Sequence, residues 1–460
     1  MKDRGYITLF LTLLISALLM LVLAVGTVIG LASARGRSAA AMRSAMSSVR
    51  AEYDRYLFEQ YHVLFLDQDP EGEGPGKLEA LVEERMAENL GPDYTVNEVR
   101  LTGVTAVTDQ NCMEFRKQVQ EAVKYLAADK GVDYLKSKVQ DDTPVKKEDM
   151  ENLNMERDEK KEKQKGDTDP RKAIRACEKA GIAYWILPED VTFSSSEVDV
   201  KSLPSEGKAG LSLMTMDSGF SDMARLSRDM SGTGGWMSSV TSESAGLIYA
   251  ANCFNCLTDC VQEDTELSLE LEYLIGGKST DAENYKTAVN QILAIRTACN
   301  FACILTDTGK MSRLSALATS LTWYFPPAQP AVKYLLAAAW SYIEAVADAY
   351  RLVRGKKVPY VKTQQNWLTD LNGLTHLDEL EEPEEDGSGL DYEDYLLILL
   401  APRMNTAYYR MLDIMELNVN RNASSEADHF HLKNAITAFG MTVEVEYEGH
   451  TVQLLEEIGF

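Results

Sequence analysis

The segment YITLFLTLLISALLMLVLAVGTVIGLASA, residues 6–34, decides the architecture of this chain. It carries no charged residue, and only a few hydroxyl side chains interrupt its apolar run. A helix of this length spans roughly 40 Å, which exceeds the hydrocarbon core of a bilayer, about 30 Å thick. The sequence therefore predicts one N-terminal transmembrane helix, and the lipid bilayer is its first expected partner. A buried core helix is the competing interpretation.

The processing and the orientation of this segment stay open. Ala32-Ser33-Ala34 fits the small-x-small rule for a secretory signal cleaved after Ala34, although the apolar run is about twice as long as a usual signal core. Lys2 and Arg4 precede the segment, and four arginines follow it, so a count of positive charges would place the C-terminal side in the cytoplasm. Long domains cross a membrane regardless of flanking charge, so charge alone does not fix the orientation.

Beyond the apolar segment, the helix is expected to continue as an amphipathic extension over residues 35–68. Gly and Pro are absent from residues 37–69, and apolar residues recur at helical intervals. The predicted packing face consists of Met42, Met46, Val49, Tyr53, Leu57 and Leu64. This face has to pack either on the chain's own domain or against a partner helix. Tyr53, Tyr56 and Tyr61 form an aromatic stripe that we expect in a core.

The chain as a whole is strongly acidic. It has 71 acidic and 46 basic residues and a formal net charge of -25. A surface this negative repels phosphate backbones, so no nucleic-acid partner is expected. The seven cysteines are an odd number in a long chain, which is unlike the dense, even framework of a small disulfide-bonded protein.

Hydropathy patterning predicts an α+β fold that is predominantly helical. A small α+β unit is expected at residues 77–140, a charged linker at 141–170 and a larger, mostly helical domain with few strands at 171–460. The expected helices of the larger domain are 173–186, 242–260, 281–304, 312–324, 331–353 and 392–417, the last divided at Pro402. The expected strands are 96–108, 266–275 and 435–448, and irregular loops are expected at 210–236 and 380–389.

Several strings resemble known proteins. The leader Lys2-Asp3-Arg4-Gly5 before Tyr6 resembles N-termini processed by prepilin peptidases, in which the mature chain begins with the apolar helix. Four further strings are similar to a domain-of-unknown-function family of Gram-positive bacteria that occurs beside Tad (Flp) pilus genes, in the manner of TadE/TadG pseudopilins. These strings are AEYDRYLFEQYHVLFLD (51–67), LTGVTAVTDQNCMEFRKQVQEAVKY (101–125), YLIGGKSTDAENYKTAVNQILAIRTACNFACILTD (273–307) and YEDYLLILL (392–400). The resemblance covers nearly the whole chain, and its most specific part surrounds Gly276-Gly277-Lys278.

The resemblance implies a single-pass protein of the cell membrane with an extracytoplasmic C-terminal domain. It also implies a role in Tad pilus assembly through contacts with pilus assembly proteins or other membrane proteins. Pilins and TadE-like proteins commonly carry Glu at the fifth position of the mature helix, and that position is Phe10 here. We therefore expect an accessory or minor pseudopilin-like component and not a major filament subunit.

The cysteines provide the alternative function. Three of them lie on one face of the expected helix 242–260, and two more are spaced i, i+4 on the helix 281–304. If the two helices pack, these thiols supply ligands for a metal, and the protein would be a metal-binding protein or a cell-envelope enzyme. The competing interpretation is cysteine in an apolar core. The residues concerned are Cys253, Cys256, Cys260, Cys299 and Cys303.

The other candidate sites each have a structural explanation. The string IGGKST (275–280) ends like a phosphate-binding loop, but Glu272 stands where that loop needs Gly, so a turn joining a strand to a helix is expected. Glu344 and Asp348 have the i, i+4 spacing of an acid-base pair, which a solvated helix face explains equally well.

His429 and His431, beside Asp428, are expected at the surface at the start of a strand. Across all these candidates, the sequence predicts no enzyme, no catalytic residue, no cofactor, no metal and no small-molecule substrate.

Overall fold

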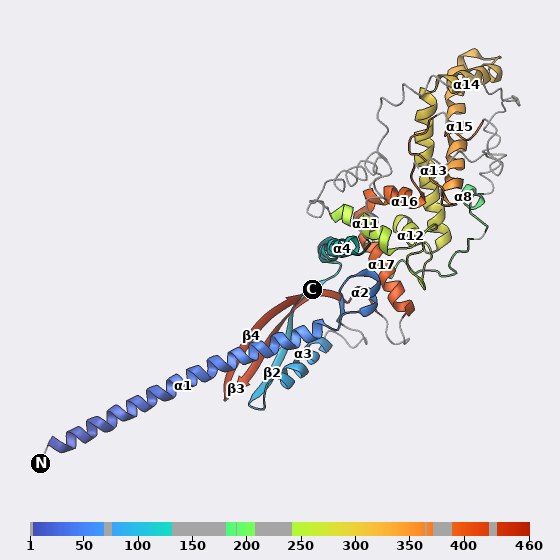
Figure 1. Ribbon diagram of the computed structural model, residues 1–460. Coiled ribbons are helices and arrows are strands. Elements are labelled where there is room, and N and C mark those ends of the chain that lie inside the picture. The colour runs from blue at the N-terminus through green and yellow to red at the C-terminus, as the bar shows by residue number, and fades with distance from the viewer. Residues whose placement is uncertain are drawn as a thin grey trace. The chain divides into compact units, whose positions relative to one another are not determined.

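A computed structural model describes residues 3–68, 76–130, 181–189, 191–207, 242–363, 366–370, 389–422 and 430–460 (Figure 1). The chain forms two compact units. Met1–Phe115 and Ala423–Phe460 make the first, which we call the sheet unit, and Arg116–Asn422 make the second, the helical unit. Helices dominate and one four-stranded sheet is present, which confirms the predicted mostly helical α+β class.

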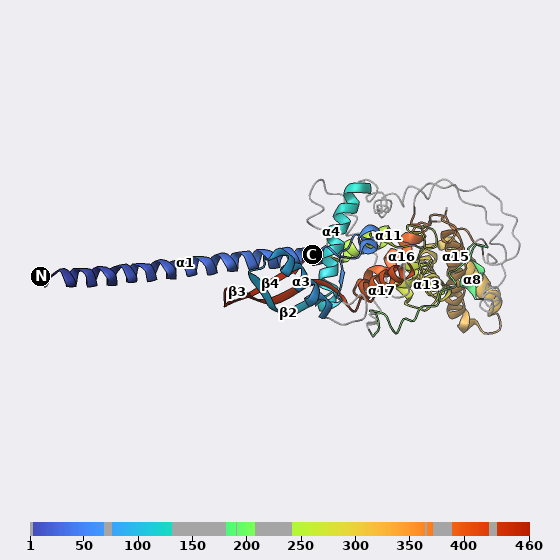
Figure 2. The same ribbon diagram turned by 90° about the horizontal axis from the view of Figure 1, so that it is seen from below.

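Helix α1 (Asp3–Arg50) is one unbroken helix with two different surroundings. Its large side chains from Leu9 to Leu31 are exposed, whereas Ala34, Ser38 and Met42 are almost completely buried. In Figure 1 and Figure 2 the outer part of α1 extends past the sheet without another described element beside it. The change from exposed to buried falls where the uncharged run ends and the arginines begin.

The helical extension predicted over residues 35–68 is too long, because α1 ends at Arg50. A second helix, α2 (Arg55–Tyr61), begins after Asp54, whose side chain accepts a hydrogen bond from the backbone N–H of Leu57 at 2.8 Å. Asp is a favoured N-cap because its short side chain satisfies a free N–H group of the first turn. His62 ends α2 in the left-handed conformation, with φ at 55°.

The sheet joins segments from the two ends of the sequence. Its strands are β1 (Leu66–Asp67), β2 (Tyr94–Ala106), β3 (Ala435–Tyr447) and β4 (His450–Gly459). The central strand β3 pairs antiparallel with the other three. β3 and β4 form a hairpin whose two turn residues, Glu448 and Gly449, both have positive φ, as in a type I′ turn. The sequence predicted β2 and β3 but not β4.

The inner half of α1 and helix α3 (Gly76–Asn89) pack against the sheet and form the core of this unit. Met42 and Met46 of α1 contact the same cluster as Met86 of α3 and Val443 of β3. The chain therefore divides differently from the sequence-based division into units at 77–140 and 171–460. The C-terminal hairpin completes the unit that begins with α1, and no local pattern reveals a partner strand more than 300 residues away in sequence.

The helical unit is built mainly from helices, of which α13 (Asp281–Thr306) packs along α15 (Gln329–Leu352) (Figure 1). Proline marks both of its predicted breaks: η2 (Pro326–Ala328) separates α14 from α15, and η5 (Ala401–Arg403) separates α16 from α17. Its helices, with α4 crossing the boundary between the units, are α4 (Asp109–Lys130), α8 (Ile182–Trp185), α11 (Ser242–Cys253), α12 (Glu270–Gly276), α13 (Asp281–Thr306), α14 (Thr308–Leu321), α15 (Gln329–Leu352), α16 (Tyr392–Leu400) and α17 (Met404–Asn422).

Two predictions for this unit are wrong. The alternating segment 266–275 was expected to be a strand, but residues 270–276 form helix α12, in which buried carboxyl groups occupy the positions that looked exposed. The helix expected over 242–260 ends at Cys253, because the following residues form a loop closed by a bridge between Cys256 and Asp259. The linker 141–170 and the loops 210–236 and 380–388 lie outside the described residues, as does most of the helix expected at 173–186.

Truncating Met46 should loosen the sheet unit more than truncating its neighbour. Met46→Ala removes a buried side chain between α1 and the sheet and should cost about 2–5 kcal/mol. Ser47→Ala, on the exposed face of the same helix, should cost less than about 0.5 kcal/mol. Amide hydrogen exchange of β3 in the detergent-solubilised full chain measures both effects. Equal exchange in the two variants would show that α1 does not hold the sheet.

Candidate functional site

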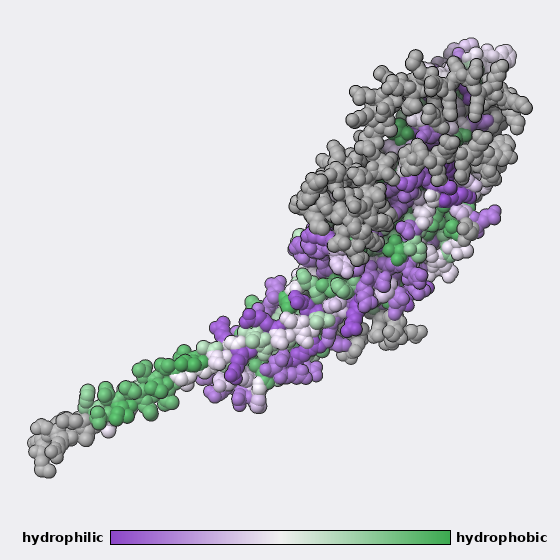
Figure 3. All heavy atoms as spheres, in the orientation of Figure 1, coloured by the Kyte–Doolittle hydropathy of each residue, from purple (hydrophilic) through white to green (hydrophobic). Residues whose placement is uncertain are grey.

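The first candidate site is the exposed apolar segment of α1, residues 9–31. Its large apolar side chains are between 38% and 70% exposed, and together they form the green outer section of the helix in Figure 3. Each such side chain gains roughly 1.5–3 kcal/mol on full burial, so a segment of this length strongly favours lipid or another protein over water. By length and composition, the helix is able to cross a membrane.

The few hydroxyl groups in this segment do not oppose burial in lipid. Thr12, Ser16 and Thr27 each donate to a backbone carbonyl three residues earlier, at 2.8–2.9 Å. A polar group satisfied within its own helix does not need water, which is the condition for entering hydrocarbon. Helix α13 also meets the length and composition criteria, but 44% of its apolar window is buried, and it is a core helix of the helical unit.

The arginines behind the segment take part in the packing of the sheet unit. Arg50 donates to the carbonyl oxygen of Gly459 at 2.9 Å, and Arg43 lies 3.4 Å from the carboxylate of Glu456. Both partners belong to β4, so two of the four arginines in the charge count also attach α1 to the sheet. These two arginines have a structural role, so they are not evidence that the C-terminal side lies in the cytoplasm. The count of positive charges is therefore weaker evidence of orientation.

The residues of the predicted packing face fall on two helices and on the irregular segments that follow them. Met42, Met46 and Val49 are buried on α1, and Leu57 is buried on α2. Tyr53 and Leu64 are half-buried and lie outside both helices. Of the aromatic stripe, Tyr61 is buried, and its ring meets that of Tyr56 edge-on at 6.3 Å. The leader residues Gly5 and Tyr6 have helical backbone, and Phe10 is 67% exposed.

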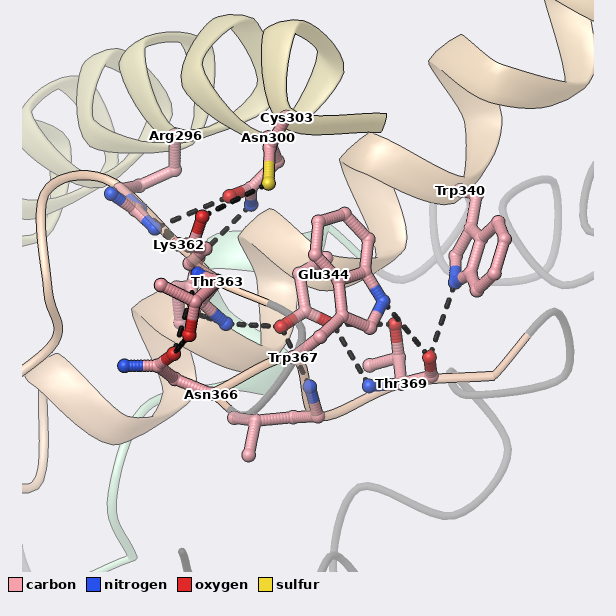
Figure 4. Close-up of polar contacts among 12 residues, drawn as sticks. Arg296, Asn300, Cys303, Trp340, Glu344, Lys362, Thr363, Asn366, Trp367 and Thr369 are labelled. Atoms are coloured by element: carbon pink, nitrogen blue, oxygen red, sulfur yellow. Dashed lines mark hydrogen bonds and ion pairs between the residues drawn. The ribbon is translucent and has the colours of Figure 1, made fainter. Parts of the chain in front are cut away.

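A second candidate site is a buried group of charges between α13 and α15, which we call the ion cluster: Arg296, Asn300, Glu344, Asp348 and Lys362 (Figure 4). Arg296 lies 2.9 Å from Asp348, and the Lys362 ammonium lies 2.6 Å from the other oxygen of that carboxylate. Asn300 donates to Asp348 at 3.0 Å. Burial opposes ionisation of Asp348, but Arg296 and Lys362 outweigh it and lower its pKa.

The other carboxylate of the ion cluster attaches an irregular segment to the helices. Glu344 pairs with Lys362 and accepts hydrogen bonds from the backbone N–H groups of Leu368 and Thr369, at 2.9 and 2.8 Å. The carbonyl oxygen of Thr369 in turn accepts from the indole N–H groups of Trp340 and Trp367. Glu344 and Lys362 therefore hold the described parts of the following segment, residues 356–363 and 366–370, against α15.

A solvated helix face was one of the two explanations for the i, i+4 spacing of Glu344 and Asp348. The structure contradicts this explanation. Both side chains are fully buried: Arg296 from α13 pairs with Asp348, and Lys362 from the segment after α15 pairs with both carboxylates. The usable signal in the sequence is a single arginine in the apolar run ILAIRTACN. A charge in such a run has to be paired when the helix is buried. The geometry is that of a structural ion cluster, in which cations engage both carboxylates and backbone N–H groups also bond Glu344.

A third group consists of carboxyl groups that capture backbone amides around α12. Asp281, the first residue of α13, accepts from the N–H groups of Ser194, Ser268 and Leu269 at 2.9–3.2 Å. Glu270 accepts from the Asn255 N–H at 2.8 Å and from the Asn418 amide at 2.7 Å. These contacts hold irregular segments in place. The backbone N–H groups concerned have no partner in a helix or strand, so the carboxyl groups accept from them.

Burial raises the pKa of the carboxyl groups in this region. The pKa of Glu270 rises to about 8 and that of Glu272 to about 7, because both side chains are removed from water. Burial likewise raises the pKa of Asp394 to about 8 and that of Asp413 to about 6. Asp413 is hydrogen-bonded by the Tyr273 hydroxyl at 2.9 Å and by the Ser205 N–H at 2.9 Å.

The string IGGKST (275–280) is a turn between two helices, not between a strand and a helix. Gly277 ends α12 in the left-handed conformation, with φ at 58°, and Thr280 caps α13. A Cβ on Gly277 would lie 2.5 Å from the Arg410 guanidinium, and a Cβ on Gly276 would lie 2.6 Å from the Asn284 side chain. Asn284 bonds both the N–H and the carbonyl of Lys278. These contacts explain why this turn has two glycines and requires no phosphate.

The structure does not bring the five cysteines into a metal site. Cys253 is at the end of α11, Cys256 and Cys260 are in the following loop, and Cys299 and Cys303 are on α13. Among the described residues, no group of three or more His, Cys, Asp or Glu has the geometry to hold a metal ion.

Of the histidine pair, His431 is exposed, and His429 and Asp428 lie outside the described residues.

The site features together define a mostly helical α+β protein whose N-terminal helix is able to cross a membrane. Residues 159–447, well over half of the chain, match the model of a family of unknown function (DUF5702), and the chain belongs to that family. The match includes all of the described helices from α8 to α17 and ends with β3. No curated protein and no solved structure matches the chain.

The helical unit should lose stability as pH rises from about 5 to about 9. The pKa of Glu270, about 8, lies above its unfolded value of 4.5, so its stabilising contribution is complete below the unfolded pKa and disappears as pH rises through the folded one. Glu270→Gln stays neutral and should flatten this dependence, each pKa unit being worth about 1.4 kcal/mol.

Urea unfolding of the full chain across this pH range, followed by tryptophan fluorescence, measures the slope. The exposed Glu283→Gln is the matched control and should leave the slope unchanged. An identical slope in Glu270→Gln and the unchanged chain would contradict the role of this carboxyl group.

Proposed function

We propose that this protein is a membrane-anchored, extracytoplasmic accessory or minor pseudopilin-like component of Tad pilus assembly. It acts through protein–protein contacts and is not an enzyme. The observation that carries the proposal is the division of α1 into an exposed apolar half and a half that packs on its own sheet. This division supports a subunit that inserts one helix into a bilayer and holds a folded domain directly on the end of that helix.

The exposed half of α1 supports an accessory role. Phe10 occupies the fifth position of the helix counted from Tyr6, and its side chain is 67% exposed. A phenylalanine can pack against a neighbouring helix but cannot pair with the terminal amine of a neighbouring subunit. Helix α1 can therefore pack sideways against another helix in the membrane. It cannot form the pair between Glu and a terminal amine that the resemblance implies for major subunits.

The buried polar groups favour a binding role over catalysis. In the ion cluster, Glu344 and Asp348 are engaged by Lys362, Arg296 and backbone N–H groups. An acid-base catalyst needs a carboxyl group within reach of a substrate proton. Carboxyl groups that are saturated by cations and backbone supply fold stability, and they support assigning the function to the surfaces of the protein.

The mature N-terminus tests the pseudopilin assignment. Mass spectrometry of the membrane-extracted protein should find Tyr6 as the first residue, because the leader ends at Gly5. Gly5→Asp should block this cleavage and leave Met1 in place, whereas Phe10→Leu should be processed normally. A first residue at Arg35 would exclude retention of the helix, and an intact Met1 in the unchanged protein would make it a plain anchor.

Labelling of Cys260 tests which side of the membrane holds the helical unit. Cys260 is exposed, whereas Cys112, Cys253 and Cys256 are buried. A membrane-impermeant maleimide added to intact cells should label the protein, and Cys260→Ser should lose that share of the label. Labelling of Cys260 only after the cells are opened would place the domain in the cytoplasm and contradict the proposal.

A further inference from the structure

The tip of the α14–α15 hairpin exposes a group of large apolar and aromatic side chains, which we call the tip patch. Trp323 is 79% exposed and Tyr324 is 74% exposed, and they are followed directly by Phe325. Tyr334 and Leu335, from the first turns of α15, are each about half exposed. Monomeric proteins rarely leave so many large apolar groups together in water, and such patches mark binding surfaces.

The exposure is built into the turn. Beneath the tip, the hairpin closes its own core with Leu314 and Ala318 of α14 and Leu336 and Trp340 of α15, so the tip residues are not needed to complete it. Pro326 and Pro327 begin η2, and the Phe325 N–H donates to the carbonyl oxygen of Thr322 at 2.9 Å. A proline-stiffened turn therefore presents three successive aromatic residues outward, and little ordering entropy is lost when they bind.

The sequence of the hairpin that carries the tip patch has a charge opposite to that of the chain as a whole. No Asp or Glu occurs from residue 308 to residue 343, although the whole chain has 71 acidic residues. The same stretch contains three cations, and of these Lys310 is paired with Asp307. Lys333 lies over the Tyr334 ring, which places a cation beside the aromatic tip, whereas Arg313 lies over the Trp340 ring in the core beneath it.

We infer that the tip patch is a membrane-binding site that inserts into the interface of a bilayer with anionic headgroups. Trp and Tyr are enriched at the headgroup level because each has an apolar ring and a polar edge. Lys333 beside the rings attracts anionic lipid within a Debye length, and the lack of acidic residues from 308 to 343 reduces the repulsion that this acidic chain would otherwise cause. A second copy is a poorer occupant, since a symmetric contact would bring Lys333 of one copy close to that of the other.

This inference concerns the helical unit alone and does not depend on the pilus assignment. It also needs no particular placement of the two units, because lipid contact is measured directly. The full-length protein is reconstituted into vesicles of brominated phosphatidylcholine, with or without phosphatidylglycerol. The spectrum of Trp323→Phe is subtracted from that of the unchanged protein, which isolates the emission of Trp323.

In vesicles with phosphatidylglycerol, Trp323 emission should shift to shorter wavelength and lose most of its intensity to the bromine atoms. The loss should be smaller at high salt, without phosphatidylglycerol, and in Lys333→Glu. Trp185, on α8 and 43% exposed, is the matched control. Its contribution, isolated with Trp185→Phe, should be equally bright in brominated and unbrominated vesicles.

Three results would overturn the inference. Trp323 emission that is unaffected by bromine in both lipid mixtures would show that the tip does not reach lipid. A spectral change that follows protein density in either mixture would make a second copy the occupant. A change that occurs only when a purified membrane protein partner is added would make the tip patch a protein-binding surface.

Discussion

The structure depends on the solvation of one helix. Water is a poor solvent for residues 9–31, and the same helix becomes a core element once Ala34, Ser38 and Met42 meet the sheet. No loop separates the two environments, so the sheet unit is attached directly to the end of the apolar segment. A helix is the only element that can do this, because all its backbone groups are satisfied internally in either solvent. Further along the helix, Arg43 and Arg50 contact β4 and attach this half of α1 to the sheet.

In the helical unit, irregular segments of the chain are held against the helices by buried carboxyl groups. Its long helices leave stretches of chain that have no strand partners, and buried carboxyl groups bond the free amides of those stretches. Asp281, Glu344 and Asp413 each accept from backbone N–H groups of a segment distant in sequence or across a loop. A buried polar group without a hydrogen-bond partner costs free energy of folding. Other arrangements of the loops would leave these carboxyl groups without partners, so the observed arrangement is favoured. The loops that Asp281, Glu344 and Asp413 hold in place explain why these acids are buried.

The sequence predicted the features that depend on local pattern. The apolar segment, the long helices α13, α14 and α15, and the breaks at Pro326 and Pro402 follow from hydropathy and from the chemistry of proline. The sequence failed where tertiary contacts decide the outcome. Glu270 and Glu272 made residues 266–275 look like a half-exposed strand, yet both are buried in a helix because amides reach them from the loop 254–258. The partner of β2 lies at the other end of the chain, and the partners of Arg296 become visible only when α13 and α15 pack.

The negative net charge of this chain limits where its exposed apolar surfaces can associate with other molecules. A chain with a net charge of -25 repels its own copies and most acidic proteins, so accidental association through exposed apolar groups is suppressed. Two exposed apolar surfaces are exceptions within the described residues: the uncharged segment of α1 and the tip patch, which has Lys333 beside it. Both lack acidic residues, so contact there avoids the repulsion that protects the remaining surface. An acidic surface that is interrupted at these places favours association there over association elsewhere.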